Sequence, residues 1–513
     1  MVTAAAHASY DEMPYEGGLV VGSHPEHLAT VGRLFGMTPA PIERCRVLEI
    51  GCATGMNLLA MAYSLPGCEF VGIDPSGRQI ELGRKALAEY GITNVELATT
   101  DVREAVEWQR EFDYIVCHGV FSWVAPDVQE AILAACRRLL TPQGIAFISY
   151  NTLPGFHMRA PVGEMLRFHS RNFPEPGERT DQAGALLKFL VESSGTFAES
   201  DEVLGIYHRM LKREKELLDG APPSYLMHEH LEDLGKGFYL HEFVDAARAR
   251  GLQYLGDAAF HTMLVRDLPE AIAADLNRIS PNQVALEQYR DFVVNRMFRK
   301  SLVCRDDVAL ERHISEEAIR SLSFRARLAR NAEPPWLIPK TGGLVARVSD
   351  PRVTAVIEAL DAAEPAAPSF AELSALLSGD DGVAAEDLPA ILLSLYALDA
   401  VEFRSWAPQV GMAVPERAEA FLPARMAAQA GKRDVPVPFH NSVVLDPFIC
   451  RMLPLVDGSR DRDALAAAMG SIAAADSADM PAASGPGDLG PDQLARLVDE
   501  ALEQLLRAGL LVD

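Results

Sequence analysis

The stretch RVLEIGCATGMN, residues 46–57, decides how this chain folds. A short apolar run ends at Gly51, and a helix-forming run begins after Gly55. Glycine allows the sharp turn and the close approach of backbone to ligand that nucleotide-binding α/β sheets use at this place. The spacing is G-x-x-x-G, and Glu49 stands just ahead of the turn. A carboxylate there disfavours a pyrophosphate and suits the ammonium group of a methionine moiety.

Two more acids follow the next strands of the same pattern. Asp74 comes roughly 20 residues after the turn, where ribose hydroxyls are normally held. Asp101 follows a third apolar run and can accept a hydrogen bond from an adenine amino group. Together these features predict a site for S-adenosylmethionine, whose demethylated product is S-adenosylhomocysteine. The residues predicted to bind this cofactor are Tyr10, Glu49, Gly51, Ala53, Gly55, Asn57, Asp74, Pro75, Gln79, Thr100, Asp101, Val102, His118 and Gly119.

Outward from the turn, strands and helices alternate. The predicted strands are Arg46–Ile50, Glu69–Ile73, Val95–Ala98, Phe112–Cys117 and Ile145–Tyr150, and the predicted helices are Asn57–Ser64, Ser76–Tyr90 and Asp127–Leu140. This alternation predicts parallel βαβ units, and the near-continuous apolar strands predict burial on both faces of the sheet. The predicted fold class is α/β, a Rossmann-like sheet with a helical insertion, followed by mainly α-helical domains.

Aromatic side chains flank the predicted site. The fourth strand ends in CHGVFSW, and ligand crevices in such sheets lie at the carboxyl ends of strands. His118 is therefore expected to border the methyl donor, and Phe121 or Trp123 to wall an acceptor channel or to belong to the core. Tyr10 and Tyr15 precede the first strand and predict a flap over the cofactor; the alternative is a tail with two incidental tyrosines. Tyr15, His118 and Trp123 are the candidate catalytic residues, and no metal site is predicted.

Five regions are predicted from the length and the pattern. They are an N-terminal cap over the cofactor site (1–40), a catalytic domain (41–270) with a helical insertion at about 158–220, a helical middle region (271–338), and two winged-helix-like repeats (339–410 and 411–513). Leu252–Leu255 is a candidate sixth strand after the insertion. Glu333–Pro335 is the predicted boundary before the first repeat.

The two repeats each contain three helices and a short strand in the same order. Asp350-Pro351 opens the first helix of one repeat, and Asp446-Pro447 opens the first helix of the other. The plainest interpretation is a pair of helical interaction domains. The third helices carry few basic residues, so DNA binding is not expected. The segment Ala473–Pro491 is rich in small residues and proline and predicts a flexible loop.

Charge and cysteine content limit the classes of binding partner and site that we expect. The formal net charge is −25, whereas nucleic-acid binding depends on basic surfaces, so we expect no nucleic-acid partner and favour a lysine-rich or cationic one. No apolar run approaches the roughly 18 residues of a membrane span. The seven cysteines are scattered and form no CxxC pair, which argues against a zinc site or a disulfide framework and favours the cytoplasm.

Several stretches together resemble one family. They are SYDEMPY (9–15), VLEIGCATGMN (47–57), FVGIDPSGRQI (70–80), FDYIVCHGVFSWV (112–124), SYNTLPGFH (149–157), YLMHEHLE (225–232) and EQYRDFVVNRMFR (287–299). They resemble the bacterial methyltransferases that carry a methyltransferase regulatory domain, in particular the rickettsial protein-lysine methyltransferases. The resemblance covers most of residues 9–300 and thins in the last third. Met56 stands where the family usually has glycine, and Phe156 where it usually has tryptophan.

The resemblance implies a homodimer, no metal, and a donor site open to the lysines of a protein substrate, such as a surface or outer-membrane protein before export. The expected reaction is a direct in-line displacement with reacting atoms about 3–3.5 Å apart. A lysine ammonium must first lose a proton, and an apolar channel next to a sulfonium lowers its pKa. Two alternatives fit the same residues: methylation of a small molecule, and a cofactor-binding regulatory scaffold without turnover.

Overall fold

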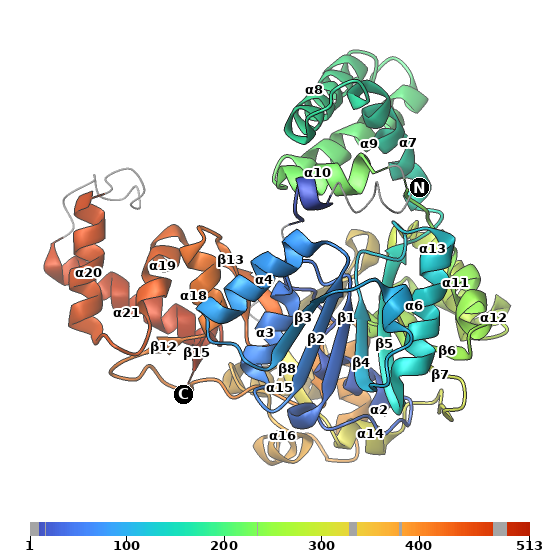
Figure 1. Cartoon of the computed structure of the whole chain (residues 1–513). Helices are drawn as coiled ribbons and strands as arrows, with labels where there is room; N and C mark the ends of the chain where they lie inside the picture. Colours follow the sequence, from blue (N-terminus) through green and yellow to red (C-terminus); the bar gives the residue numbers. More distant parts are fainter. Residues whose placement is uncertain are drawn as a thin grey trace.

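The computed structural model describes residues 10–15, 17–232, 234–327, 336–378, 382–475 and 490–512. Its centre is a seven-stranded sheet with the order β3-β2-β1-β4-β5-β7-β6 (Figure 1). The strands are β1 Arg46–Ile50, β2 Glu69–Asp74, β3 Val95–Thr99, β4 Phe112–Cys117, β5 Leu140–Asn151, β6 Leu252–Asp257 and β7 Phe298–Arg305. The first five are parallel to their neighbours among themselves, as predicted, and β6 confirms the candidate sixth strand.

Strand β7 corrects the prediction that residues 271–338 are helical. Helices α12 Glu270–Ile279 and α13 Gln283–Val294 do form, but β7 then runs antiparallel between β5 and β6. The sheet therefore extends past the predicted domain boundary at residue 270. The sequence did not predict β7 because of Arg299, whose charge is typical of a solvent-facing residue. In the structure this side chain is 1% exposed. It is held by three carboxylates at 2.8–3.0 Å, those of Asp257, Glu287 and Asp291.

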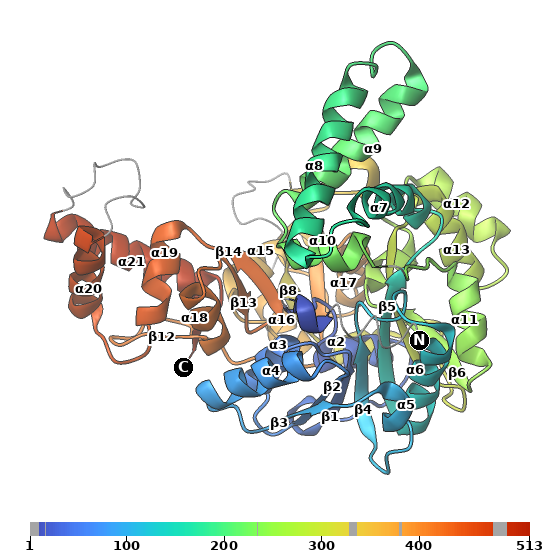
Figure 2. The same cartoon turned by 45° about the horizontal axis from the view of Figure 1, so that its top comes forward.

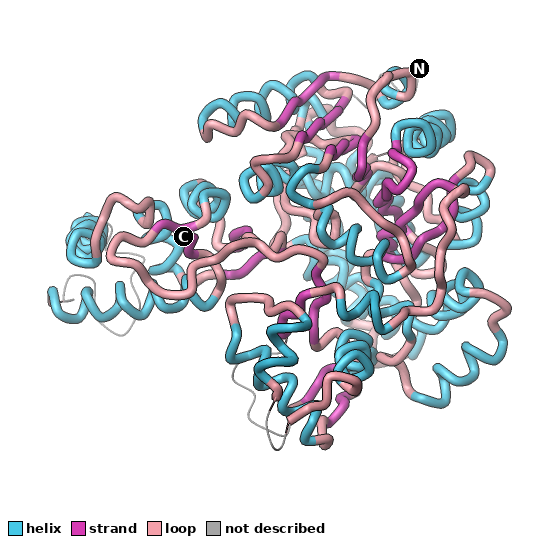
Figure 3. The backbone as a smooth tube through the Cα atoms, turned by 90° about the horizontal axis from the view of Figure 1, so that it is seen from below, coloured by secondary structure: helices cyan, strands magenta, loops and turns pink. Residues whose placement is uncertain are grey.

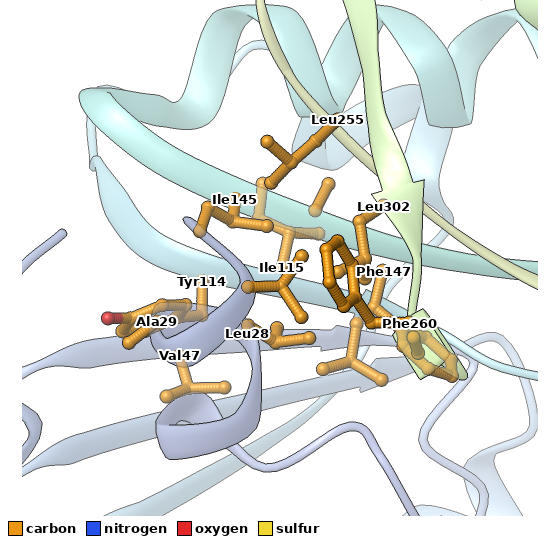
Figure 4. Close-up of a cluster of buried hydrophobic side chains, with 14 of the residues drawn as sticks. Leu28, Ala29, Val47, Tyr114, Ile115, Ile145, Phe147, Leu255, Phe260 and Leu302 are labelled. Carbon is orange, nitrogen blue, oxygen red and sulfur yellow. The ribbon is translucent and has the colours of Figure 1, made fainter. Parts of the chain in front are cut away.

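Helices pack along this sheet. They are α2 Pro25–Leu34, α3 Met56–Ser64, α4 Gly77–Glu89, α5 Val102–Ala105, α6 Pro126–Leu139 and α11 Leu240–Arg248. The predicted helices thus occur within a residue or two of their expected ends. Leu28 of α2 lies with Ile115, Phe147 and Leu302 in a continuous apolar core (Figure 4). This core fixes the strand ends on which the site is built.

A helical insertion follows β5, as predicted for residues 158–220, and reaches residue 230. It contains α7 Phe156–Ser170, α8 Pro176–Gly195, α9 Glu202–Leu218 and α10 Pro223–His230. Its buried side chains form a small core of their own. Helices α8 and α9 extend away from the sheet as a pair, whereas α10 returns to the body of the protein (Figure 2).

The last third confirms the predicted repeat and adds strands to it. The first repeat has α15 Pro351–Ala363, α16 Phe370–Leu376, α17 Leu388–Ala397 and β11 Val401–Arg404. The second has α18 Leu422–Gln429, α19 Pro447–Met452, α20 Arg462–Ala475, α21 Pro491–Arg507 and β15 Leu511–Val512. In each repeat the last strand pairs with a strand that precedes the helices. Strand β11 pairs with β8 Ser323–Ala326, and β15 pairs with β12 Glu419–Ala420.

Each repeat also contains a β-hairpin that the sequence did not predict. These are β9 Leu337–Pro339 with β10 Val345–Arg347, and β13 Asp434–Val437 with β14 Asn441–Val444. The first repeat shares the main core, whereas the second has a separate core and stands to one side of the sheet (Figure 3). The predicted boundary Glu333–Pro335 and residues 476–489 of the predicted loop lie outside the described residues.

Over the described part of the chain, no helix combines the length and the apolar composition needed to cross a membrane. The same residues contain no group of three or more histidine, cysteine, aspartate or glutamate side chains arranged to hold a metal ion.

Candidate functional site

The turn from β1 into α3 is shaped by two glycines. Gly51 and Gly55 have φ values of +71° and +72°, a region that side-chain-bearing residues rarely adopt. A Cβ on Gly51 would lie 2.3 Å from a methyl carbon of Val120, so the neighbouring loop leaves no room for one. The backbone nitrogens of Gly51 and Cys52 both donate to the carbonyl of Ile73, at 2.8 and 3.1 Å. The turn is therefore fixed against the end of β2.

Asp74, at the end of β2, braces this turn. Its carboxylate accepts hydrogen bonds from the backbone nitrogens of Ala53 at 3.0 Å and Ser76 at 2.9 Å. Asp74 is only 8% exposed, because these amides draw its side chain under the loop. A carboxylate oxygen can accept two hydrogen bonds, so the brace is compatible with the predicted contacts to ribose hydroxyls.

Glu49 lies behind the same turn and is buried. Its Oε1 accepts a hydrogen bond of 2.9 Å from Nδ2 of Asn57, whereas Oε2 has no hydrogen-bond partner within the described part of the chain. Burial raises the pKa of Glu49 to about 8, and the nearby charge of Asp74 acts in the same direction. A buried carboxylate oxygen without a partner is costly unless a cation pairs with it. The methionine ammonium of S-adenosylmethionine fits this requirement.

A small apolar pocket of about 90 Å³ opens beside the turn, towards the ends of β2 and β3. It is lined by Ile50, Gly51, Ile73, Pro75, Thr100, Asp101, Val102, Val120, Trp123, Val124, Ala125, Val128 and Leu234. Asp101 caps α5, and both of its oxygens accept hydrogen bonds from Arg103, at 2.7–3.0 Å. An adenine amino group would have to share that carboxylate with Arg103. Trp123, a candidate catalytic residue, lies in the wall of this pocket.

The end of β4 carries His118 and Gly119. Nδ1 of His118 lies 3.0 Å from the hydroxyl of Ser149, which also accepts a hydrogen bond of 2.9 Å from the backbone of Gly119. Burial lowers the pKa of His118 to about 4, and the charge of Lys300 contributes. The imidazole is therefore neutral at pH 7. Phe121, one of two aromatic residues considered for a channel wall, instead belongs to the core at 2% exposure.

The N-terminal segment 10–15 lies against both the catalytic sheet and the insertion. The ring of Tyr10 stacks on His228 of α10 with centroids 4.1 Å apart, and Nε2 of His228 lies 2.7 Å from the carbonyl of Met13. On the other side, the hydroxyl of Ser76 donates to Asp11 at 2.6 Å. Burial raises the pKa of Tyr10 above its ordinary value, and that of Tyr15 to about 12. This arrangement supports the predicted flap.

Some site residues had not been singled out from the sequence. His228 holds the flap, and Ser149 holds His118, although both lie in stretches that carry the family resemblance. Gln79, which was predicted, is buried in the first turn of α4, and no partner of its Oε1 occurs among the described residues. His440 contacts Asn57 from the second repeat, and no sequence signal points to it.

A larger cavity of about 300 Å³ lies at the end of β6 and the start of β7. Its walls are Val21, Gly22, His24, Glu26, His27, Asp257, Ala258, Ala259, Phe260, His261, Arg296, Phe298, Lys300, Arg327, Tyr396, Asp399, Glu402, Phe403, Arg404, Phe439, His440 and Asn441. Phe298 meets the His118 ring edge-on with centroids 5.9 Å apart, and Lys300 pairs across the sheet with Ser149. The small pocket thus lies at the end of β1, and the cavity lies farther along the sheet, by β6 and β7.

Three family models match the chain. Residues 48–146 match a methyltransferase domain, residues 222–305 a predicted methyltransferase regulatory domain, and residues 416–510 the C-terminal winged helix domain of PKMT proteins. The first match contains the glycine turn and the three acids. The last match coincides with the second repeat.

Two relatives and two solved structures are similar to large parts of this chain. An uncharacterized protein of Rickettsia prowazekii is 39% identical over 255 residues, which are 50% of this chain and 100% of that protein. Another from the same organism is 37% identical over 63% of this chain, and the match spans only 57% of that protein's length. The structure of PKMT2 from Rickettsia typhi has a TM-score of 0.81, with 27% identity over 97% of this chain and 100% of that one. Its complex with AdoHcy, S-adenosylhomocysteine, matches equally, with 28% identity over 98% and 100%.

Proposed function

Because this chain belongs to the bacterial methyltransferases that carry a methyltransferase regulatory domain, we propose that it transfers methyl groups from S-adenosylmethionine to lysine side chains of a protein substrate. The single observation that carries the donor half of this proposal is Oε2 of Glu49, a buried oxygen without a partner among the described residues, placed beside the glycine turn. An amino-acid ammonium is the group that this oxygen lacks.

The donor would be held by residues from the ends of three neighbouring strands. Glu49 would pair with the ammonium, Asp74 would accept from the ribose hydroxyls, and the pocket beside Asp101 would enclose the adenine. S-adenosylmethionine supplies a methyl group on a positively charged sulfur. The flap, residues 10–15, would exclude water from the ribose side of the donor site. It contacts Ser76 next to Asp74 and, on its other side, His228 of the insertion.

The acceptor side of the proposal rests on the larger cavity. Its aromatic side chains, among them Phe260 and Phe298, suit the alkyl stem and the cationic head of a lysine. His118, whose ring contacts Phe298 of this cavity, is neutral at pH 7, so it does not repel an incoming ammonium. Desolvation in such a passage lowers the pKa of the lysine and favours the free amine that must attack.

One labelling experiment distinguishes the candidate acceptors. The purified chain is incubated with a cell lysate and isotope-labelled S-adenosylmethionine, and the products are separated by mass spectrometry. Label on lysines of proteins is the expected result. Label on a small molecule supports the second candidate function, for which the same donor residues would serve. No label in either fraction contradicts both and favours a scaffold without turnover. A Glu49→Gln variant is the matched control, because it retains the shape of the site and lacks the charge.

We also propose that the chain forms a homodimer through helices α8 and α9. This pair projects from the body (Figure 2). Phe189 of α8, Val203 of α9 and Phe197 in the turn between them are 61%, 71% and 57% exposed. Large exposed apolar patches on a soluble protein usually mark an interface. In analytical ultracentrifugation, the parent should sediment as a dimer and the double variant Phe189→Ser, Val203→Ser as a monomer. A monomeric parent contradicts the proposal.

The cytoplasm is the proposed location, supported by seven cysteine thiols that are all unpaired and buried. The proposed substrate is a lysine-bearing protein, such as a surface protein methylated before export, and the net charge of −25 favours a cationic partner. Fractionation of cells that produce the chain, followed by immunodetection, tests the location. Recovery in the periplasmic fraction would contradict it.

A further inference from the structure

The amide of Asn57 has all of its hydrogen-bonding capacity occupied. Nδ2 donates to Glu49 Oε1 at 2.9 Å and to the hydroxyl of Ser23 at 3.2 Å. Oδ1 accepts from the backbone nitrogen of Val20 at 2.9 Å and lies 3.0 Å from Nε2 of His440. An asparagine amide has two donor hydrogens and an oxygen that accepts two hydrogen bonds, so these four contacts complete it.

The orientation of this amide follows from its partners. The backbone nitrogen of Val20 can only donate, so the atom that faces it must be the oxygen. Nε2 of His440, facing the same oxygen, must therefore carry a proton. His440 is 5% exposed, and burial next to Arg404 lowers its pKa to about 3, so the imidazole is neutral and donates through Nε2. The amide nitrogen is thereby directed at Glu49.

His440 reaches this place from the second winged-helix-like repeat. It lies at the tip of the hairpin formed by β13 and β14 and has a φ of +55°, a left-handed conformation that is uncommon outside glycine. The preceding Phe439 is held between the guanidinium groups of Arg325 and Arg404, which lie 4.2 and 4.8 Å from its ring centroid. The tip is thus fixed in its position by the first repeat.

From this geometry we infer that His440 is a positioning residue for the methyl donor, which acts through Asn57 to hold Glu49 in place. The second repeat then completes the donor site and is more than an appended interaction module. The inference rests on the proposed donor site and is independent of the proposed acceptor. The repeat also touches the same helix at its other end, where Phe421 meets Tyr63 of α3 with ring centroids 5.3 Å apart.

The test measures binding of S-adenosylhomocysteine to the full chain by calorimetry, together with the melting temperature of the empty protein. His440→Leu retains the volume and removes the donor hydrogen, so the affinity should fall about tenfold. His440→Gln restores an amide hydrogen at a similar distance from the backbone and should bind within about threefold of the parent. Phe421→Leu is the matched control. It loosens the contact of the same repeat with the same helix, so it should lower the melting temperature while affinity stays within about threefold.

A double-mutant cycle separates positioning from general damage. If His440 acts through Asn57, adding His440→Leu to Asn57→Ala should weaken binding by no more than about twofold beyond Asn57→Ala alone. Three results would each overturn the inference: His440→Leu binding within twofold of the parent, equal losses in His440→Leu and Phe421→Leu, or additive losses in the cycle. If His440→Leu does not fold, a tenfold loss in folded His440→Gln overturns it as well.

Failure of the proposed function gives a different pattern. A parent that binds S-adenosylhomocysteine but labels no protein refutes the protein acceptor and leaves the role of His440 intact. A parent that binds no S-adenosylhomocysteine refutes the donor site, and the role of His440 with it.

Discussion

The two ends of the donor site are built in different ways. The ribose and adenine end comes almost wholly from residues 50–128, in which Asp74 ends β2, Asp101 follows the neighbouring β3, and the small pocket is lined from the same stretch except for Leu234. At the amino-acid end, Asn57 binds Glu49 and is itself contacted by Val20, which precedes α2, and by His440 of the second repeat. A local stretch of sequence can specify most of the first end. The second end exists only when distant regions have docked.

The largest effect is expected at the local end, from Asp74→Ala. Two acceptor contacts to ribose would be lost, and hydrogen bonds to a charged group contribute about 1.5–3 kcal/mol each, so affinity for S-adenosylhomocysteine should fall by about a hundredfold or more. Because the same carboxylate braces the amides of Ala53 and Ser76, the melting temperature should fall too. Asp74→Asn should be intermediate in calorimetry. An Asp74→Ala variant that binds like the parent would show that this end is misassigned.

At the amino-acid end, which we call the remote end because its residues come from distant parts of the chain, one variant should weaken binding and yet raise stability. Glu49→Gln should weaken product binding roughly thirtyfold, because one charge-assisted bond is lost. The folded-state pKa of Glu49 is raised to about 8, so its burial costs stability once pH exceeds the ordinary value of 4.5, and this cost grows until pH passes 8. Removing the ionisable group should therefore raise the melting temperature of the empty protein at pH 8. A fall in both quantities would contradict this reasoning.

The same pKa predicts how pH acts on the remote end. Glu49 is mostly protonated at pH 6, so affinity for S-adenosylhomocysteine should increase about tenfold from pH 6 to pH 7 as the carboxylate ionises. The thiols of Cys52 and Cys117 face the same carboxyl group, but burial raises their pKa values further, so they remain neutral. The carboxyl of Asp74 is the other charged neighbour. In Glu49→Gln the dependence should disappear; if the variant retains it, another group is responsible.

The smallest effect is expected at the flap, which contacts Ser76 beside the ribose end and His228 of the insertion. Tyr10→Ala removes the ring stacked on His228 and should weaken product binding about fivefold, in keeping with the usual energy of an aromatic pair. Tyr10→Phe retains the stack and should bind like the parent. Deleting residues 1–16 should resemble Tyr10→Ala, with little change in the melting curve of the empty protein. If deletion leaves affinity unchanged, the segment is not a flap.

The contrast between the ends also explains what could be predicted from the sequence. Strands β1 and β4 were predicted residue for residue, because their apolar runs are short and bounded by glycine or charged residues. The glycine turn and Asp74 followed from spacing alone. The burial of Asp74 did not, because it depends on which backbone amides the carboxylate meets.

The missed features depend on partners far away in the chain. Strand β7 contains Arg299, and only the three carboxylates around it make that residue a core residue. The contact between His440 and Asn57 spans 383 positions, and neither residue stands in a pattern that points to the other. Hydrophobic periodicity describes one element at a time, so contacts between domains lie beyond it.

The reach of the β13–β14 hairpin has a consequence for how the protein is made. A ribosome that adds ~5–20 residues per second needs roughly 20–80 s to travel from Asn57 to His440. During that interval the nascent chain can already fold its sheet up to β5, yet the amide of Asn57 that holds Glu49 lacks its contact with His440. Binding of the methyl donor would then reach full strength only near the end of synthesis, so that a truncated chain that stops before the hairpin would bind S-adenosylmethionine about tenfold more weakly.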